Sequence, residues 1–448
     1  EKADTAAGRP SAMDAHVSLP PHVGPAHRYS KGTCGPIILL LRHMGSSALL
    51  RALPWAAIAA GYTVTLHTQV ACNSWPSFCG NGHPEWTADT AEFLFVHTYS
   101  YHAILLASGF GLVFRLNQSL GRYWESRSAA QNMAAKWCDV LSMALAFDEL
   151  PDATGCQERE CAPFARCVTH LCSLLHAVAL HTLRGDLTLG TLSPYAAPLS
   201  PQRRGVRALF CGGRDALRRE RAAAAFSARN PIAVLGGVTA AERARLAASA
   251  ERVHVVIGWL TRLLVRRRKS GGLSEAEAPV VSRIYQVLSD GTFWYLSALK
   301  VADTPFPILV AQLNAATCYV NLALLPVIVA DKVASVALGA VISFFGVGFL
   351  FSLNEVAREL EDPFSSELGV WMGINRLHVP LMQRHFDERC LALGACGVGE
   401  LTDLLLADAD AEGEEQLYAD FLADAIGPSE EGRAARKAAP REGGSAPV

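Results

Sequence analysis

The stretch from Phe93 to Arg127 reads FLFVHTYSYHAILLASGFGLVFRLNQSLGRYWESR, and it decides the fold of this chain. Its first part, up to Phe114, contains no Asp, Glu, Lys or Arg. A helix that crosses a bilayer needs about 20 mostly apolar residues, and this part is long enough. Arg115, Arg122 and Arg127 follow, and a basic cluster of this kind marks the cytoplasmic side of a span. The stretch therefore predicts a transmembrane helix and its orientation.

One face of this helix changes character along its length. Every fourth residue lies on the same side of a helix, and here that side carries Thr98, His102, Leu106, Phe110 and Phe114. The face begins polar, becomes bulky and apolar, and ends beside arginine. From the residues alone, such an apolar stripe is more often a packing surface between helices. On the opposite face we expect small residues that allow close packing in lipid: Ala103, Ala107, Gly109 and Gly111.

The rest of the chain has the composition of a membrane protein. Of its 448 residues 50% are hydrophobic, the mean hydropathy is +0.20, and the apolar residues gather in blocks. Further spans are predicted at 46–65, 304–330 and 333–353, so that four helices cross the bilayer. Gln312, Asn314 and Asn321 lie at membrane depth and are expected to face protein or a pore. A net charge of −2 gives no footprint for nucleic acid.

The regions outside the spans divide by composition. We expect a mobile leader at 1–35, a first membrane region at 36–115, a helical soluble domain at 116–303 and a second membrane region at 304–355. A belt-like segment at 356–395 and an acidic, then disordered tail at 396–448 follow. Within the soluble domain, helical spacing predicts amphipathic helices at 129–147, 161–183, 240–264 and 274–299. An insert at about 185–235 is expected to be a loop with one short helix near 214–226.

Three blocks of this sequence resemble the bestrophin family, most closely its plant, algal and bacterial members. They are FRLNQSLGRYWESR at 114–127, VSRIYQVLSDGTFWYLSALKVADTPFP at 281–307 and LEDPF at 360–364. The resemblance extends over about 36–393. It implies an all-α integral membrane protein with four transmembrane helices per subunit and a large helical cytosolic or stromal domain. It also implies a homopentamer around one central anion pore.

The resemblance further implies roles for the striped face. Leu106, Phe110 and Phe114 would line a narrow hydrophobic neck on the symmetry axis, with Thr98 and His102 at its mouth. A ring of apolar side chains can gate by dewetting, and the positive edges of phenyl rings can face a passing anion. His102 fits two roles: a helix-interface side chain, or a ring of imidazoles that concentrates anions when protonated.

The charged residues at the end of the helix also fit two roles. Arg115, Arg122 and Arg127 are topology anchors, and facing an inner vestibule they would also attract anions. Glu125 lies three residues from Arg122, so the two are expected to pair.

Calcium binding stays open at the sequence level. Calcium requires six to eight oxygen ligands in a compact arrangement. Glu359, Asp362 and Glu367 are candidate ligands, but Ser365 and Ser366 interrupt the dense acidic run that animal bestrophins have. We therefore interpret LEDPF mainly as a belt that joins neighbouring subunits.

The expected function is passive conduction of chloride, with bicarbonate and nitrate as further candidate anions, through a homopentamer in a lipid bilayer. The alternative is a non-conducting membrane scaffold or auxiliary subunit with the same fold. An enzyme is not expected, because the sequence has no nucleophile elbow, P-loop or zinc signature. The chloroplast thylakoid is the favoured location and the plasma membrane the alternative. Whether Cys72 and Cys79 form a disulfide is left open.

Overall fold

The computed structural model describes residues 48–71, 98–148, 158–186, 188–195, 224–225, 227–228, 230–273, 277–333, 335–365 and 377–395. Four helices within these ranges are long and apolar enough to cross a membrane. They are α2 (Ala48–Ala71), α4 (Thr98–Ala146), α10 (Ile308–Lys332) and α11 (Val336–Leu360). The prediction of a multi-pass, four-span α-helical membrane protein is confirmed. The leader, the tail, and Cys72 and Cys79 lie outside the described residues.

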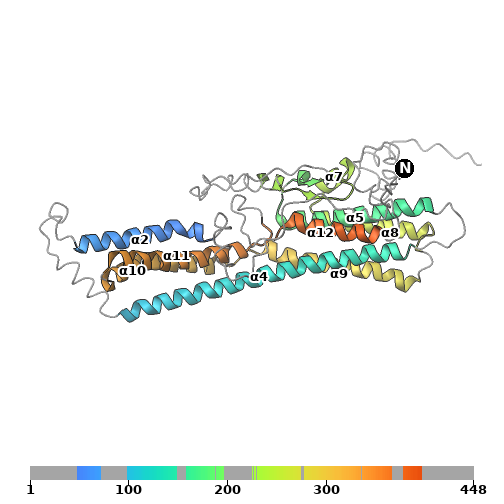
Figure 1. The fold of residues 1–448 in the computed structure, drawn as a ribbon. Coiled ribbons are helices and arrows are strands. Elements are labelled where there is room, and N and C mark those ends of the chain that lie inside the picture. The colour runs from blue at the N-terminus through green and yellow to red at the C-terminus, as the bar shows by residue number, and fades with distance from the viewer. Residues whose placement is uncertain are drawn as a thin grey trace, which may run out of the picture.

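The helix α4 is much longer than the sequence suggested. We expected the span to end near Phe114 and a separate helix to occupy 129–147, but one helix of 49 residues joins them. At 1.5 Å per residue it is about 70 Å long, enough to cross a bilayer and continue into water. Figure 1 shows α4 running beside the membrane helices and on along the soluble domain. The arginine cluster therefore marks a change of surroundings and not a break in the backbone.

The membrane helices pack through small side chains. On α2, the residues Ala52, Ala56, Ala59 and Thr63 are buried, and this helix lies along α11. A Cβ built on Gly348 of α11 would lie 3.2 Å from the Cβ of Ala56, so the two backbones approach closely. In lipid, close approach of this kind supplies the van der Waals contact that holds helices together. Pro54 is accommodated inside α2 without ending it.

The soluble domain surrounds α5 (Glu158–Arg184), which is buried along most of its length. The helices α4, α8 (Arg252–Lys269), α9 (Ala278–Asp303) and α12 (Val379–Ala395) pack against it. In Figure 1, α5, α8 and α12 lie together at the end away from α2, α10 and α11. The helix expected at 240–264 is two helices, α7 (Ala240–Ala247) and α8. A capping box of Thr239 and Glu242 starts α7.

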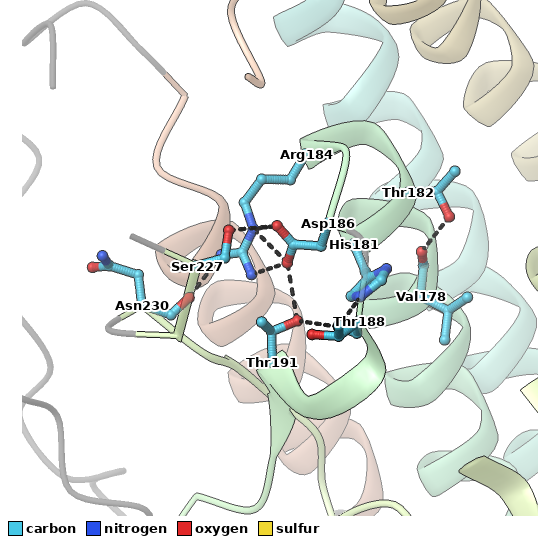
Figure 2. A network of polar contacts seen from close by, with 9 residues as sticks. All are labelled: Val178, His181, Thr182, Arg184, Asp186, Thr188, Thr191, Ser227 and Asn230. Atoms are coloured by element: carbon cyan, nitrogen blue, oxygen red, sulfur yellow. Dashed lines mark hydrogen bonds and ion pairs between the residues drawn. The ribbon is translucent and has the colours of Figure 1, made fainter. Parts of the chain in front are cut away.

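A network of polar contacts joins the two sides of the insert (Figure 2). The carboxylate of Asp186 is ion-paired with Arg184 and accepts hydrogen bonds from Thr191 Oγ1 at 3.0 Å and Ser227 Oγ at 2.5 Å. The guanidinium of Arg184 also donates to the carbonyl of Asn230 at 2.7 Å. Nearby, the strands β1 (Leu192–Ser193) and β2 (Ile232–Ala233) pair in parallel. The short helix expected at 214–226 lies almost wholly outside the described residues.

Candidate pore-lining helix

One face of α4 packs inside its own subunit. That face carries Tyr101, Ser108, Leu112, Arg115 and Ser119, each at most 5% exposed. Of the small residues expected to pack closely, Ala103 and Ala107 are exposed and Gly109 and Gly111 are half-buried, and a Cβ built on Gly111 would lie 3.1 Å from Asn314 Oδ1. The predicted close packing is therefore confirmed at Gly111 and wrong for the two alanines, because residues seven apart return to nearly the same side of a helix. Ala103 therefore lies close to the face of Phe110.

The opposite face of α4 carries the expected neck residues. Leu106 is 75% exposed, Phe110 76% and Phe114 51%, so none of them packs fully against another span of the same subunit. Phe110 and Leu112 are two residues, or about 200°, apart on the helix, which separates the exposed stripe from the buried one. Large apolar side chains left this exposed indicate a surface meant for lipid, for another subunit or for a pore.

The polar residues at the N-terminal end of this stripe are Thr98 and His102. His102 is exposed, and its ring lies 6.3 Å from that of Tyr101 in an edge arrangement. Thr98 is the first residue of α4, and its side chain lies outside what the structure describes. The role of both residues at a pore mouth stays a prediction.

Arg115 holds α4 to the end of α11. Its Nε donates to Glu361 at 2.7 Å, and its Nη1 donates to Asn354 at 2.6 Å. The guanidinium also lies over the ring of Phe306, 5.6 Å from its centroid. With 4% of its surface exposed, Arg115 is a buried ion-pair partner and not the vestibule cation that the sequence predicted. Arg115 lies three residues after Leu112 on the buried stripe, and only the packing of α4 on α10 and α11 decides that this stripe is buried.

Arg122 has a similar structural task. It donates hydrogen bonds to the backbone carbonyls of Val301, Thr304 and Glu361, at 2.9, 2.7 and 3.0 Å. These carbonyls lie where α9 and α11 end, so the guanidinium of Arg122 links the C-terminal ends of both helices to α4. The expected pair with Glu125 is not formed.

The partner of Glu125 is Lys300 of α9, whose Nζ lies 2.6 Å away. Arg127, the third predicted vestibule cation, is half-buried. Of the three arginines, Arg127 alone keeps its predicted role as a vestibule cation, and that role stays untested.

The candidate calcium ligands that the structure describes have different surroundings. The carboxylate of Glu359 is 2% exposed and ion-paired with Arg51 of α2 at 2.9 Å, so it does not offer a free oxygen pair to a cation. Asp362 is half-buried, and Glu367 lies outside the described residues. Within the described ranges, no group of three or more His, Cys, Asp or Glu is arranged to hold a metal ion.

Polar residues at membrane depth stabilise the bundle. Asn321 of α10 is fully buried, and its Nδ2 donates to Ser108 Oγ of α4 at 2.8 Å. Asn314 is also buried, and it donates to the carbonyl of Val310 at 2.8 Å. These two asparagines face protein as predicted, whereas Gln312 is exposed. Sequence reasoning missed Ser108, because its partner Asn321 is distant in the sequence.

Comparison with known proteins agrees with this architecture. The family described as Bacterial/Fungal Bestrophin protein matches residues 89–369. No curated protein matches the chain. A crystal structure of a bacterial bestrophin homologue from Klebsiella pneumoniae has 14% sequence identity and a TM-score of 0.50, covering 75% of this chain and 97% of that chain. A variant of that homologue has 15% identity and a TM-score of 0.51, covering 77% and 99%.

The two kinds of similarity carry different weight. The structural matches have low identity and therefore show the fold alone. The family match spans more than half of the sequence and includes α4, the 281–307 block and LEDPF. The chain therefore belongs to the bestrophin family.

Proposed function

We propose that this protein is a passive anion channel in which five copies of the chain surround one central pore lined by α4. The observation that carries the proposal is the exposure of Leu106, Phe110 and Phe114 on the face of α4 that points away from its own subunit. A symmetric assembly around this face would turn one stripe into three stacked apolar rings. Such rings form a hydrophobic constriction that gates by dewetting.

Selectivity in this proposal comes mainly from the neck. Phenyl edges carry the positive end of the ring quadrupole and can face an anion, whereas a cation receives no such help. Glu361 compensates the charge of Arg115, and backbone carbonyls accept hydrogen bonds from Arg122. Of the three predicted arginines, Arg127 is therefore the one proposed to attract anions. Chloride is the proposed main ion, and bicarbonate and nitrate are the competing candidates.

Recording from the purified protein in planar bilayers tests the proposal. We expect reversal potentials under bi-ionic chloride, bicarbonate and nitrate to follow the anion gradients, with and without calcium. The mass in detergent is expected to correspond to five copies of the 48.0 kDa chain. A protein of that mass without anion current would instead support the scaffold alternative.

Substitution of the neck makes the test specific. Replacing Phe110→Ala and Phe114→Ala together should raise the leak current, because a wider and less apolar ring stays hydrated. Phe345→Ala is the matched control, since Phe345 is 67% exposed but belongs to α11. Unchanged gating and permeability ratios in the double variant would contradict the neck assignment.

The membrane in which the channel works is also a proposal. The thylakoid is favoured and the plasma membrane is the alternative. Fractionation of the source cells, followed by detection of the chain, distinguishes the two.

A further inference from the structure

Three thiols from three helices meet in the core of the soluble domain. Cys138 of α4, Cys172 of α5 and Cys390 of α12 are all free. Cys172 and Cys390 lie in one buried hydrophobic cluster and Cys138 packs against it, which brings the Cys138 and Cys390 thiols close enough to interact. Because α12 packs directly on both α4 and α5, the fold brings together residues that are far apart in the sequence.

The pair of Cys138 and Cys390 is asymmetric in both access and charge. Cys138 is half-buried, whereas Cys390 is buried completely. The hydrogen bond from Cys390, together with the charge of Arg389, lowers the pKa of the Cys138 thiol. Burial raises the pKa of Cys390. The more acidic thiol of the pair therefore belongs to the less buried residue, and the thiolate is the form that attacks a disulfide.

We propose that Cys138 and Cys390 form a redox modification site, at which a small disulfide such as oxidised glutathione converts the two thiols into a bond between α4 and α12. In the first step the Cys138 thiolate attacks one sulphur of oxidised glutathione, and glutathione thiolate leaves. In the second step Cys390 attacks Sγ of Cys138, and the second glutathione leaves with the proton of Cys390. One disulfide is reduced for each one that forms.

The position of this bond gives it a consequence for the pore. Cys138 lies on the same unbroken helix that carries Phe110 and Phe114. Cys390 lies on the helix that follows the segment leaving α11. Oxidation would thus tie the last described helix to the proposed pore helix. The bond itself does not depend on the proposed function; only its effect on current rests on that function.

Peptide mapping of the full-length wild-type protein in detergent tests the site. The protein is incubated with oxidised glutathione or with dithiothreitol, alkylated, digested and examined by mass spectrometry. We expect a peptide cross-linked between Cys138 and Cys390 in the oxidised sample and two alkylated peptides in the reduced one. Full alkylation of both residues after oxidation, or a cross-link that uses Cys172, would overturn the proposal.

Two variants assign the roles of the two sulphurs. In Cys390→Ser the second step is lost, so Cys138 should retain a glutathione adduct that reduction removes. Absence of that adduct would refute Cys138 as the attacking thiol. Cys167→Ser is the matched control, because Cys167 is a buried free thiol on α5 outside the pair, and this variant should form the cross-link as the wild type does.

If the channel conducts, oxidation should change the wild-type current and leave that of Cys390→Ser unaltered. A cross-link that forms without any change in current would show that the bond does not regulate conduction and would overturn that part of the proposal. It would leave the channel proposal untouched.

Discussion

At the scale of single residues, charged groups are buried both between the two domains and inside the soluble domain. Arg115 and Glu361 join the proposed pore helix to the end of α11 at the level where the membrane helices stop. In the soluble domain, Asp387 is fully buried and accepts hydrogen bonds from Tyr195 Oη at 2.6 Å and Gln383 Nε2 at 2.9 Å. Both donors are neutral, so burial of the Asp387 charge is only partly compensated.

The first prediction concerns Arg115. Arg115→Met leaves Glu361 and Asn354 without their donor, and loss of one partner of a buried ion pair costs about 3 kcal/mol. Thermal unfolding of the purified protein in detergent measures this loss. Arg358→Met is the control, because Arg358 is 48% exposed and lies 3.5 Å from Glu355, so its loss should cost below about 1 kcal/mol. Equal losses in the two variants would contradict the assignment.

The second prediction concerns pH. Burial raises the pKa of Asp387 from 3.8 to about 7. Between these values the unfolded chain releases a proton that the folded chain keeps, so stability falls as the pH rises from about 4 to 7. The whole difference corresponds to about 4 kcal/mol.

Asp387→Asn removes this titration. The difference in melting temperature between Asp387→Asn and wild type should therefore move in favour of the variant from pH 4 to pH 7 and then level off. A constant offset from changed hydrogen bonding would not depend on pH. A difference that stays flat throughout would show that Asp387 ionises normally.

At the scale of elements, the helix boundaries differ from those that the sequence pattern predicts. The helix α4 runs on through a strongly polar stretch because residues 115–128 contain no proline and pack on α9. The crossing of α4 with α9 requires a glycine on α9. A Cβ at Gly291 would lie 2.4 Å from the indole of Trp137. The close approach of these two helices thus depends on a missing side chain.

The third prediction follows from that crossing. Gly291→Ala forces Trp137 or the α9 backbone to move, and overpacking of this kind costs about 1–3 kcal/mol. Gly258→Ala in α8 is the control, because nothing lies within 4 Å of its Cβ position. Alanine there should raise stability by about 0.5–1 kcal/mol through helix propensity. Thermal unfolding of both variants checks the opposite signs, and a stabilising Gly291→Ala would refute the close contact.

At the scale of the whole molecule, apolar side chains remain exposed beyond the membrane spans. Trp124 of α4 is 59% exposed, and Phe293 and Leu296 of α9 are 64% and 46% exposed. The helices α4 and α9 pack together, so these side chains belong to one helical pair of the soluble domain. In the proposed pentamer, neighbouring copies would cover such residues.

The fourth prediction tests whether neighbouring copies of the chain cover these side chains. Phe293→Glu introduces a charge into the proposed contact between copies, and an unpaired buried charge is strongly unfavourable. The mass in detergent should fall from five copies toward one. Val265→Glu on α8 is the control, because Val265 is 41% exposed on a helix that packs on α5 and α7. A pentamer that survives Phe293→Glu unchanged would place the contact elsewhere.

Much of the architecture could be predicted because membrane spans leave a strong signal. A run of about 20 mostly apolar residues is the length that a helix needs to cross a bilayer, and such runs are rare in water-soluble domains. All four spans were therefore found, with bounds that differ from α2, α10 and α11 by several residues. The apolar stripe of Leu106, Phe110 and Phe114 was also predicted correctly as one face, since helical spacing is set by the backbone.

The partners of charged residues could not be predicted. From the sequence, Arg115 and Arg122 were interpreted as topology anchors that would also attract anions, and Glu359 as a candidate calcium ligand. In the structure, Arg115 is ion-paired with Glu361, Arg122 donates to backbone carbonyls, and Glu359 is ion-paired with Arg51. These partners are distant in the sequence. No local pattern encodes such contacts.

By itself, the sequence determined that this protein is a helical membrane protein, where its spans lie, and which residues share the striped face of α4. Those properties follow from hydrophobic length and helical period, which are local. Only the tertiary structure decided that α4 is one continuous helix, which of its faces is buried, and that Cys138 meets Cys390. Those properties depend on how distant helices pack, because burial and pairing are set by neighbours in space and not by neighbours along the chain.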